Sequence, residues 1–442
     1  MDATQPPQEP VREWVLEAEQ ELRLEIDFKH TVKIKLKSGR AELFGTELTL
    51  DPEYLFRGRK LAIFTWHGCT LDVKGQCSGY VAGETPMYTY LNTHLALAQL
   101  SAEAKARDEM GPRVLILGPT DVGKSTLAKI LLNYSTKQSL KPLFVDIDPK
   151  EGTVAVPGAL STIAIARMID AEDDFGASPT ITNSTPYVLY YGQTSPTEKP
   201  IWYKTLLSNL AAVVSKKTEI DPEVRSSGII IDSPSQFVES GGRDLLMHTI
   251  TEFKVNVILV IGHERMYSDL KQEFNDNSGI SIIKLHKSGG VVNRDDTFRK
   301  QSQSQKISEY FYGTPKLEHS PYSCSVNYAD ITIRQVGEGT LAPSSALPLG
   351  AQRKVAETRM VKIDPGEILL HSIMAVSNVP VDPDAALSVD EESRNIAKTP
   401  LAGFVYVSEV DEVRKKLTVL APMPGRLPKK YFVLGSLKWI EI

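Results

Sequence analysis

The sequence contains only three cysteines, Cys69, Cys77 and Cys324, and no two of them form a C-x-x-C pair. This scarcity excludes a disulfide framework or a zinc knuckle and is typical of a reducing compartment. The longest apolar runs, such as Val255 to Ile261, are too short to span a bilayer. The first ten residues are polar and proline-rich, without the apolar region of a signal peptide. We therefore expect a protein that is neither secreted nor embedded in a membrane.

The chain also lacks a general excess of positive charge. Its formal net charge is −5 and its pI is near 6.0, so nucleic acid would have to bind to a local patch. Composition therefore neither predicts nor excludes an RNA substrate. With 442 residues, of which 41% are hydrophobic and 24% are charged, the chain is long enough for two or three globular domains.

One motif indicates the chemistry of the middle of the chain. Gly118 to Ser125 fits the pattern G-x-x-x-x-G-K-[ST], between a strand-like run, Val114 to Leu117, and a helix-like run, Thr126 to Asn133. In such loops backbone N–H groups surround the phosphates, the lysine reaches the β and γ oxygens, and the hydroxyl binds Mg²⁺. The residues that we predict to bind the nucleotide here are Gly118, Asp121, Val122, Gly123, Lys124, Ser125 and Thr126.

Segments of alternating polarity precede and follow this motif. They predict a small antiparallel β domain before it and a second β-rich domain after Tyr312-Gly313. The segments are Leu22–Ile26, Val32–Leu36, Ala41–Phe44 and Leu61–Phe64, and then Ile331–Ile333, Phe404–Val407, Leu417–Leu420 and Tyr431–Leu434. Around the motif, continuous β-branched runs alternate with helical segments, including one from Met87 to Glu109, which indicates a buried parallel sheet.

The expected architecture is multidomain, with a central α/β phosphate-loop domain between two β-rich domains. The boundaries that we predict are 1–103 for the N-terminal β-rich domain, 104–314 for the phosphate-loop domain with its parallel sheet, and 315–442 for the C-terminal β-rich domain.

Aspartates end two of the apolar runs. Asp148 follows the run from Leu143, where a carboxylate would face the phosphates as a Mg²⁺ partner or as the base for an incoming hydroxyl. A solvated aspartate in an Asp-Pro turn is the structural alternative. Asp232 is a rival Mg²⁺ ligand, and Asp146, on the same strand face as Asp148, is a weaker candidate. Ser125, Asp148 and Asp232 are therefore the predicted metal ligands.

Two arginines, Arg294 and Arg299, follow a glycine-containing segment, and Asn293 is the predicted cap of a helix that starts there. Such a segment would suit a lid whose guanidinium groups neutralise charge on a transferred phosphoryl group. A solvated helix face is the alternative explanation. Phosphate loops serve GTPases, ATPase motors and kinases, and the chain lacks the N-K-x-D guanine signature, which disfavours a GTPase.

Further motifs resemble the polynucleotide 5′-hydroxyl kinase family of the pre-mRNA cleavage complex. They are FGTEL at 44–48, TWHGC at 65–69, TPM at 85–87, YLNTH at 90–94, KSGGVV at 287–292 and EYFYG at 309–313. The resemblance spans nearly the whole chain and implies a three-domain fold, a nuclear protein, and ATP with Mg²⁺ in the central domain. It also implies that Glu21 and Lys60 approach the nucleotide base, that Asp148 is the catalytic base, and that Arg294 and Arg299 belong to the lid.

The sequence departs from active members of that family in two places. They follow the base carboxylate with a glycine-glutamine pair, where this chain has Pro149-Lys150-Glu151-Gly152. They also carry a Gly-Trp that stacks on the terminal RNA base, where this chain has Asp232 to Gln236. Base–aromatic stacking is worth about 1–3 kcal/mol, so its loss would weaken RNA engagement roughly tenfold to a hundredfold. Another aromatic residue, such as Tyr190 or Tyr191, would have to replace it.

The sequence thus predicts an ATP-binding scaffold subunit of the mRNA 3′-end cleavage and polyadenylation complex, required for endonucleolytic cleavage and with weak or no kinase activity. Its expected partners are the other subunits and pre-mRNA, bound directly or through the complex, and its expected location is the nucleus. An active ATP-dependent polynucleotide 5′-hydroxyl kinase acting on RNA is the alternative. A transport or assembly NTPase is a third interpretation, which no water-positioning glutamine or arginine-finger motif supports.

Overall fold

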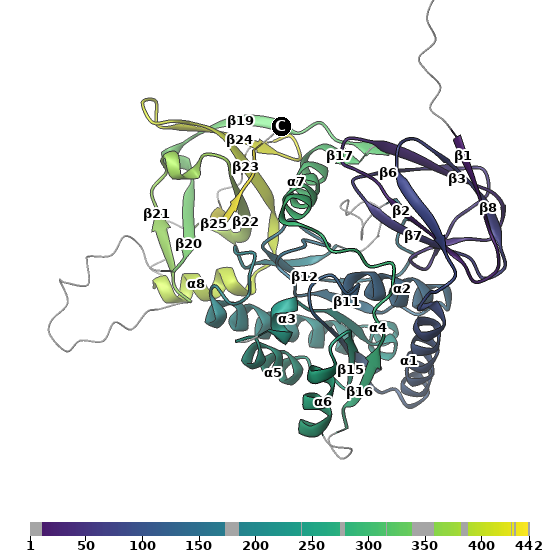
Figure 1. Ribbon diagram of the computed structural model, residues 1–442. Helices are drawn as coiled ribbons and strands as arrows, with labels where there is room; N and C mark the ends of the chain where they lie inside the picture. Colours follow the sequence, from purple (N-terminus) through teal and green to yellow (C-terminus); the bar gives the residue numbers. More distant parts are fainter. Residues whose placement is uncertain are drawn as a thin grey trace, which may run out of the picture.

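The computed structural model describes residues 11–172, 185–239, 241–274, 279–314, 316–337, 358–381, 388–425, 427 and 430–440. These residues form a central α/β domain with a β-rich domain above each of its two sides (Figure 1). The predicted β, α/β, β order is confirmed. Among the described helices, none has the length and apolar composition needed to cross a membrane.

The N-terminal domain is a sandwich of two antiparallel sheets, with strand orders β1-β8-β3-β6 and β5-β4-β7-β2-β9. Its core forms because alternate residues of each strand point inward: Val32, Ile34 and Leu36 are buried, whereas Lys33 and Lys35 between them are partly exposed. The strands are β1 (Val11–Leu16), β2 (Glu21–Glu25), β3 (Thr31–Gly39), β4 (Glu42–Leu43), β5 (Thr46–Glu47), β6 (Glu53–Arg57), β7 (Lys60–Phe64), β8 (Cys69–Lys74) and β9 (Ser78–Ala82).

The central domain contains a seven-stranded sheet of order β13-β12-β11-β14-β10-β15-β16. Its elements are α1 (Met87–Arg107), β10 (Arg113–Leu117), α2 (Lys124–Lys137), β11 (Leu143–Asp146), β12 (Ala159–Ala164), β13 (Tyr187–Tyr190), α3 (Pro200–Ile220), α4 (Pro222–Ser227), β14 (Ile229–Asp232), η1 (Ser235–Val238), α5 (Arg243–Glu252), β15 (Val257–Ile261), α6 (Glu264–Glu273), β16 (Ser281–Leu285) and α7 (Asp296–Tyr312).

The strand directions correct the prediction of a wholly parallel sheet. β11, β14, β10, β15 and β16 are parallel, but β12 pairs antiparallel with β11, and β13 pairs antiparallel with β12. A parallel neighbour needs a crossover connection, whereas residues 147–158 lead from β11 to β12 without a helix. The sheet is therefore mixed.

Helices cover both faces of this sheet. Alternate residues of β10 enter two different cores, because Leu115 and Leu117 pack with α3 and α5, and Val114 and Ile116 pack with α1 and α2. The central strands are buried on both faces, which explains why their sequences are continuous apolar runs. Their carboxyl ends meet at one edge, where the phosphate loop follows β10.

The C-terminal domain contains a second seven-stranded sheet, of order β19-β24-β23-β22-β25-β20-β21. The four predicted strand segments of this region lie in or overlap β20, β23, β24 and β25. Its elements are β17 (Gly313–Thr314), β18 (Leu317–Glu318), β19 (Tyr322–Asn327), η2 (Tyr328–Asp330), β20 (Thr332–Val336), β21 (Met360–Ile363), η4 (Glu367–Leu369), β22 (Ser372–Pro380), α8 (Val389–Lys398), β23 (Leu401–Asp411), β24 (Lys416–Ala421) and β25 (Lys430–Lys438).

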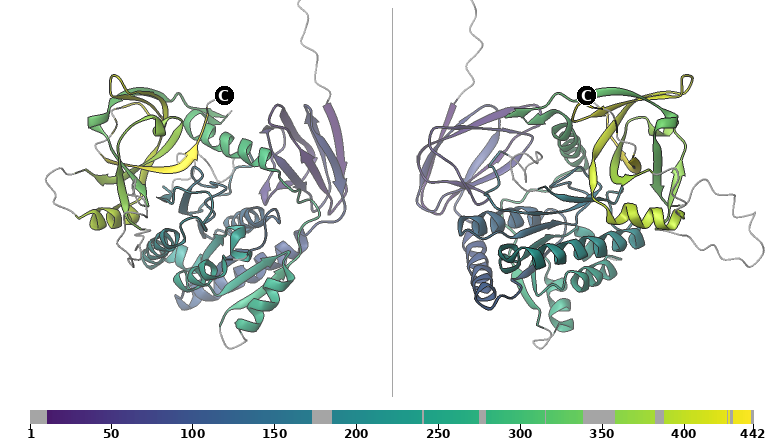
Figure 2. Two further views of the ribbon diagram at one scale, coloured as in Figure 1. Left: turned by 60° about the vertical axis from the view of Figure 1, so that its left-hand side comes forward. Right: turned by 180° about the vertical axis from the view of Figure 1, so that it is seen from behind.

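Helix α7 lies between the two β-rich domains in every view (Figure 1 and Figure 2). Near its start the Phe298 ring packs edge-on against Phe28 of the N-terminal domain, with centroids 5.0 Å apart. The helix begins later than predicted: Asp295, not Asn293, caps it, because the Asp295 carboxylate accepts the backbone N–H of Phe298 at 2.7 Å. Arg294 therefore precedes the helix, and Arg299 lies in its first turns.

Candidate nucleotide-binding site

The phosphate loop has the backbone that anion binding requires. Asp121 and Gly123 adopt positive φ values of 54° and 90°, and α2 starts at the next residue, Lys124. Over the described part of the chain, no side chain caps the N terminus of α2. Its first N–H groups therefore remain for a ligand, and the helix dipole adds positive potential there. The Lys124 ammonium is almost fully buried and donates to the Pro119 carbonyl at 3.1 Å.

A cavity of about 490 Å³ opens in front of this loop. It lies between the N-terminal domain, the central domain and residues 288–294 before α7, which we call the lid segment. It brings together most of the residues predicted from the sequence. The predicted residues that line it are Glu21, Lys60, Asp121, Val122, Gly123, Lys124, Ser125, Thr126, Asp148, Arg294 and Arg299. Gly118 and Asp232 are not among them. A Cβ atom on Gly118 would lie 2.7 Å from the Ile261 carbonyl, so this glycine allows close packing behind the loop.

Asp148 lies at the phosphate end of the cavity and is buried. Its carboxylate accepts the backbone N–H of Lys150 at 2.9 Å, and its own N–H donates to Asp146 at 3.1 Å. Burial and the negative charge of Glu151 raise the pKa of Asp148, and the positive charge of Lys124 opposes this shift. A raised pKa makes this carboxylate a stronger base than an exposed aspartate.

Asp146 and Asp232 lie behind Asp148, at the ends of neighbouring strands. Burial and the charges of Asp232 and Asp148 raise the pKa of Asp146, whose oxygens accept the N–H groups of Asp148 and Thr153. Asp146 therefore has a structural role. Burial raises the pKa of Asp232 to about 7, although the Lys124 charge and the Ser125 hydroxyl act in the opposite direction.

Asp232 has polar atoms without protein partners. Among the described residues, neither of its buried carboxylate oxygens has a partner with the distance and angle of a full hydrogen bond, although the Ser125 hydroxyl lies close enough to lower the pKa. Such an orphaned carboxylate beside Ser125 and Lys124 fits a Mg²⁺ ion with its bound water. The described residues contain no cluster of three or more His, Cys, Asp or Glu side chains that could hold a metal. This agrees with an ion that takes its other ligands from nucleotide phosphates and water.

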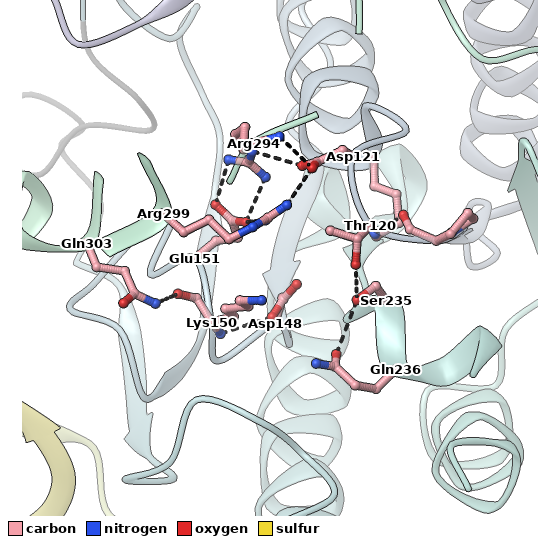
Figure 3. Close-up of polar contacts among 12 residues, drawn as sticks. Thr120, Asp121, Asp148, Lys150, Glu151, Ser235, Gln236, Arg294, Arg299 and Gln303 are labelled. Carbon is pink, nitrogen blue, oxygen red and sulfur yellow. Dashed lines mark hydrogen bonds and ion pairs between the residues drawn. The ribbon is translucent and has the colours of Figure 1, made fainter. Parts of the chain in front are cut away.

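The two lid arginines form a cluster with Asp121 and Glu151 (Figure 3). Arg294 donates to Asp121 from its backbone N–H and from Nε, both at 2.9 Å, and makes a bidentate pair with Glu151 at 2.8 and 3.1 Å. Arg299 also pairs with Asp121. Burial acts to raise the pKa of Asp121, but the two arginines outweigh it and hold this pKa below its usual value. The alternative explanation, a solvated helix face, is therefore wrong for both arginines.

At the other end of the cavity, the N-terminal domain supplies a buried polar network. The Glu21 carboxylate accepts from the Arg23 guanidinium and from the Thr85 hydroxyl, the latter at 2.8 Å. Arg23 also donates to the Glu84 carbonyl at 2.7 Å. Lys60 lies 3.4 Å from Glu25 and above the Phe298 ring, 5.2 Å from its centroid. Glu21 is buried, whereas Lys60 is partly exposed.

No aromatic platform replaces the missing tryptophan among the residues predicted for that role. Tyr190 and Tyr191 are buried in the core, and Tyr190 packs against Phe404 of the C-terminal domain. The segment after β14 instead joins the phosphate loop, because the Ser235 hydroxyl hydrogen-bonds with that of Thr120 at 2.9 Å (Figure 3). The proposed tyrosine replacement is therefore wrong.

Three family models match the chain in the order of its domains. The N-terminal β-sandwich domain of polyadenylation factor matches residues 15–104, the P-loop domain of mRNA cleavage and polyadenylation factor CLP1 matches 118–313, and the pre-mRNA cleavage complex II protein Clp1 matches 319–441. An mRNA cleavage and polyadenylation factor clp1 of Botryotinia fuckeliana is 38% identical over 96% of this chain and 92% of its own. The chain belongs to the Clp1 family.

Other Clp1 relatives carry different names. The polyribonucleotide 5′-hydroxyl-kinase Clp1 of Gallus gallus is 37% identical over 98% of this chain and 97% of its own length, and the CLP1 homolog of Arabidopsis thaliana is 39% identical over 96% and 94%. A solved complex of Clp1p with Pcf11p matches with a TM-score of 0.84 and 29% identity, covering 98% of this chain and 99% of that one. A second Clp1p structure, which concerns the Pcf11p interface and ATP loss in a point mutant, has a TM-score of 0.85.

Three residues of this Clp1 chain have roles in the site that the sequence did not predict. Arg23 lies in β2 between two leucines, and this position of a charged residue in a strand of alternating polarity is the only feature of the sequence that marks it. The side chain of Asp121 faces the lid arginines, although the motif marks only its backbone. Glu151 stands in a segment that departs from the family pattern, but its contact with Arg294 could not be predicted, because the two residues are 143 positions apart in the sequence.

Proposed function

We propose that the chain is an ATP-binding subunit of an mRNA 3′-end cleavage and polyadenylation complex, with weak or no RNA kinase activity. In this proposal Mg²⁺–ATP is a structural ligand, and the chain acts in the nucleus on pre-mRNA through its complex. Bound nucleotide would contact the N-terminal domain, the central domain and the lid at once, because residues of all three line the cavity. Ligand binding to the folded state would then stabilise their arrangement.

One observation carries the proposal. The residues that would bind the nucleotide line the cavity, whereas neither tyrosine predicted to stack on RNA is available there. The loop, Lys124, Ser125 and Asp148 meet at the cavity. At the place of the family's tryptophan, however, Ser235 hydrogen-bonds to Thr120, and the nearest predicted substitutes, Tyr190 and Tyr191, are buried. Without a stacking platform, RNA binding loses about 1–3 kcal/mol per base.

A partner subunit is the second part of the proposal. The solved relatives are complexes of Clp1p with Pcf11p, and we propose that a protein of the Pcf11p type binds this chain as well. If nucleotide stabilises the arrangement of the three domains, partner binding should depend on it.

The test combines nucleotide recovery with partner binding. Lys124→Ala should weaken ATP binding at least about thirtyfold, since it removes a buried positive charge that faces the phosphates. Ser125→Ala should reduce the Mg²⁺ dependence of that binding. Both variants should also lower the unfolding midpoint and partner recovery in pull-downs. Lys216→Ala, an exposed residue on α3, is the matched control. Unchanged midpoint and pull-down despite lost ATP would contradict the structural role.

An active polynucleotide 5′-hydroxyl kinase is the second candidate, and the position of Asp148 favours it. This buried carboxylate with a raised pKa lies in the cavity close to Lys124. There Asp148 would accept the proton of the RNA 5′ hydroxyl, and Arg294 and Arg299 would stabilise the transferring phosphoryl group. The decisive assay is transfer of label from γ-labelled ATP to a 5′-hydroxyl RNA. Label that disappears with Asp148→Ala would establish the kinase; no label, with ATP still bound, is expected for the scaffold.

A further inference from the structure

Glu151 occupies the two lid arginines from a loop outside the phosphate motif. Its carboxylate makes a bidentate pair with Arg294, at 2.8 and 3.1 Å, and lies 3.9 Å from Nη1 of Arg299 (Figure 3). A bidentate carboxylate–guanidinium pair uses the same planar donor fork that binds phosphate oxygens. Glu151 therefore holds the Arg294 donors that an incoming anionic group would otherwise engage.

The position of Glu151 places it near the reacting end of the cavity. It lines the same cavity as Lys124, Asp148 and the phosphate loop, and its charge acts on both Asp148 and Asp232. Both guanidinium groups already share Asp121, which supplies one negative charge from the loop itself. Glu151 adds a second negative charge, so the cluster is neutral before any nucleotide arrives.

One buried nitrogen of the cluster has no hydrogen-bond acceptor among the described residues. This nitrogen is Nη1 of Arg299. A buried donor without an acceptor is costly, and an oxygen of a bound ligand could satisfy it. Each guanidinium nitrogen of Arg294, by contrast, already donates one hydrogen bond, since Nε contacts Asp121 and both terminal nitrogens contact Glu151.

We propose that Glu151 sets the discrimination between nucleoside triphosphate and diphosphate, because its carboxylate competes with the terminal phosphate for the lid arginines. The inference rests on the proposed nucleotide binding. A diphosphate lacks the group that would reach the lid, so the arginines stay on Glu151. A triphosphate must share or displace that pair and approach a like charge, which reduces its advantage over the diphosphate. We therefore expect the ratio of ATP to ADP affinity to be smaller in wild type than in a protein without the Glu151 charge.

The test is Glu151→Gln, which keeps the size of the side chain and removes its charge. ATP and ADP are titrated, each with Mg²⁺, against the nucleotide-free full chain. The ratio of ATP to ADP affinity should rise at least about tenfold, since a like charge near the terminal phosphate is removed and Arg294 is released. Glu151→Asp, which keeps the charge, should leave the ratio within about threefold of wild type. The control is Glu264→Gln, because Glu264 is an exposed residue of α6 that pairs with Lys284 of β16.

A double-mutant cycle separates competition for the arginine from a general charge effect. With Arg294→Gln as background, Glu151→Gln should change the ratio by about threefold or less, because the competed group is gone. An unchanged ratio in Glu151→Gln protein that binds both nucleotides would overturn this inference alone. If wild-type protein and Glu151→Gln both fail to bind ATP, the proposed function itself is overturned, and the inference with it.

Discussion

Asp232 is a buried carboxylate whose charge interacts with Lys124 of the phosphate loop. It ends β14, is almost fully buried, and its two carboxylate oxygens lack partners in the described structure. Burying an unpaired carboxylate destabilises a fold, and the group responds by taking up a proton. A metal ion with its water would remove this cost, so Asp232 should affect free and nucleotide-bound protein in opposite directions.

The pH dependence of stability tests this idea. Burial raises the pKa of Asp232 to about 7 in the folded protein, against about 3.9 when unfolded. Between those values the folded state binds the proton and the unfolded state does not, so this group lowers stability as pH rises from about 4 to about 7. Asp232→Asn should therefore be up to about 4 kcal/mol more stable than wild type near pH 8, without nucleotide, because a shift of about three pKa units is worth about 1.36 kcal/mol per unit.

Two comparisons complete the experiment. Unfolding midpoints of wild type and Asp232→Asn, measured without nucleotide, should converge below about pH 3, where the carboxyl is neutral in both the folded and the unfolded state. With Mg²⁺ and ATP added at pH 8 the order should reverse, because only wild type can bind the ion through this carboxylate. A variant that is less stable at every pH, with or without nucleotide, would show that the carboxylate has a structural partner instead.

At the scale of elements, the lid segment contacts the N-terminal domain through a glycine. Gly290 precedes α7 and packs against Arg23, whose guanidinium is held by Glu21 and by the Glu84 carbonyl. A Cβ atom on Gly290 would lie 2.6 Å from Nε of Arg23, which is too close for any real contact. Because Arg23 has fixed partners, it cannot move aside cheaply, so the lid would have to shift.

Gly290→Ala should therefore weaken ATP binding by about tenfold, since a displaced lid loses well-placed contacts worth about 1.4 kcal/mol. Its unfolding midpoint without nucleotide should change little, because the segment is partly exposed. Gly289→Ala is the matched control: there a Cβ atom would lie 3.5 Å from Arg23, which is ordinary contact. Titration calorimetry of both variants decides, and equal affinities for ATP would contradict a role for the Gly290–Arg23 contact.

The elements differ in how far the sequence revealed them. The buried central strands β10, β11, β14 and β15 were predictable, because strands covered on both faces are continuous apolar runs. The antiparallel direction of β12 and β13 was not, since a run of apolar residues carries no direction. The start of α7 was placed too early because both Asn293 and Asp295 are good caps and only the backbone distinguishes them.

The site shows the same division. The phosphate loop was predictable because its residues are adjacent in sequence, and Asp148 because it directly follows a buried strand. The arginine–carboxylate cluster was not, because Asp121 and Arg294 are 173 residues apart. Tyr190 and Tyr191 were misjudged because their burial comes from packing against α3 and the C-terminal domain. The domain boundaries at 103/104 and 314/315 stay predictions.

At the scale of the whole molecule, α7 joins all three domains. Its N-terminal end carries the arginine cluster and contacts Phe28, whereas its C-terminal end contacts the C-terminal domain. There Phe311 stacks on Trp439, with centroids 6.0 Å apart, and the Trp439 indole donates to the Ser304 hydroxyl at 2.9 Å. Any change that loosens α7 from one side should therefore affect how the domains unfold relative to one another.

Trp439→Ala isolates the C-terminal side of this link. Trp439 is buried and also packs edge-on against Tyr406, with centroids 4.9 Å apart, so its removal should cost about 3–5 kcal/mol of packing. Because that contact joins the C-terminal domain to α7 and lies outside the nucleotide cavity, we expect an earlier, separate calorimetric transition for the C-terminal domain. ATP affinity should stay within about twofold of wild type.

Trp439→Phe is the control, because it keeps an aromatic ring against Phe311 and loses only the hydrogen bond to Ser304. It should cost about 1 kcal/mol and leave the transitions merged. In Trp439→Ala, added ATP should raise the unfolding midpoint of the N-terminal and central domains and leave the separate transition of the C-terminal domain unchanged. The reason is that ligand binding stabilises only the domains that unfold together with the binding site. If ATP raised both transitions equally, the C-terminal domain would be coupled to the nucleotide through contacts other than those of Trp439, such as the packing of Tyr190 against Phe404.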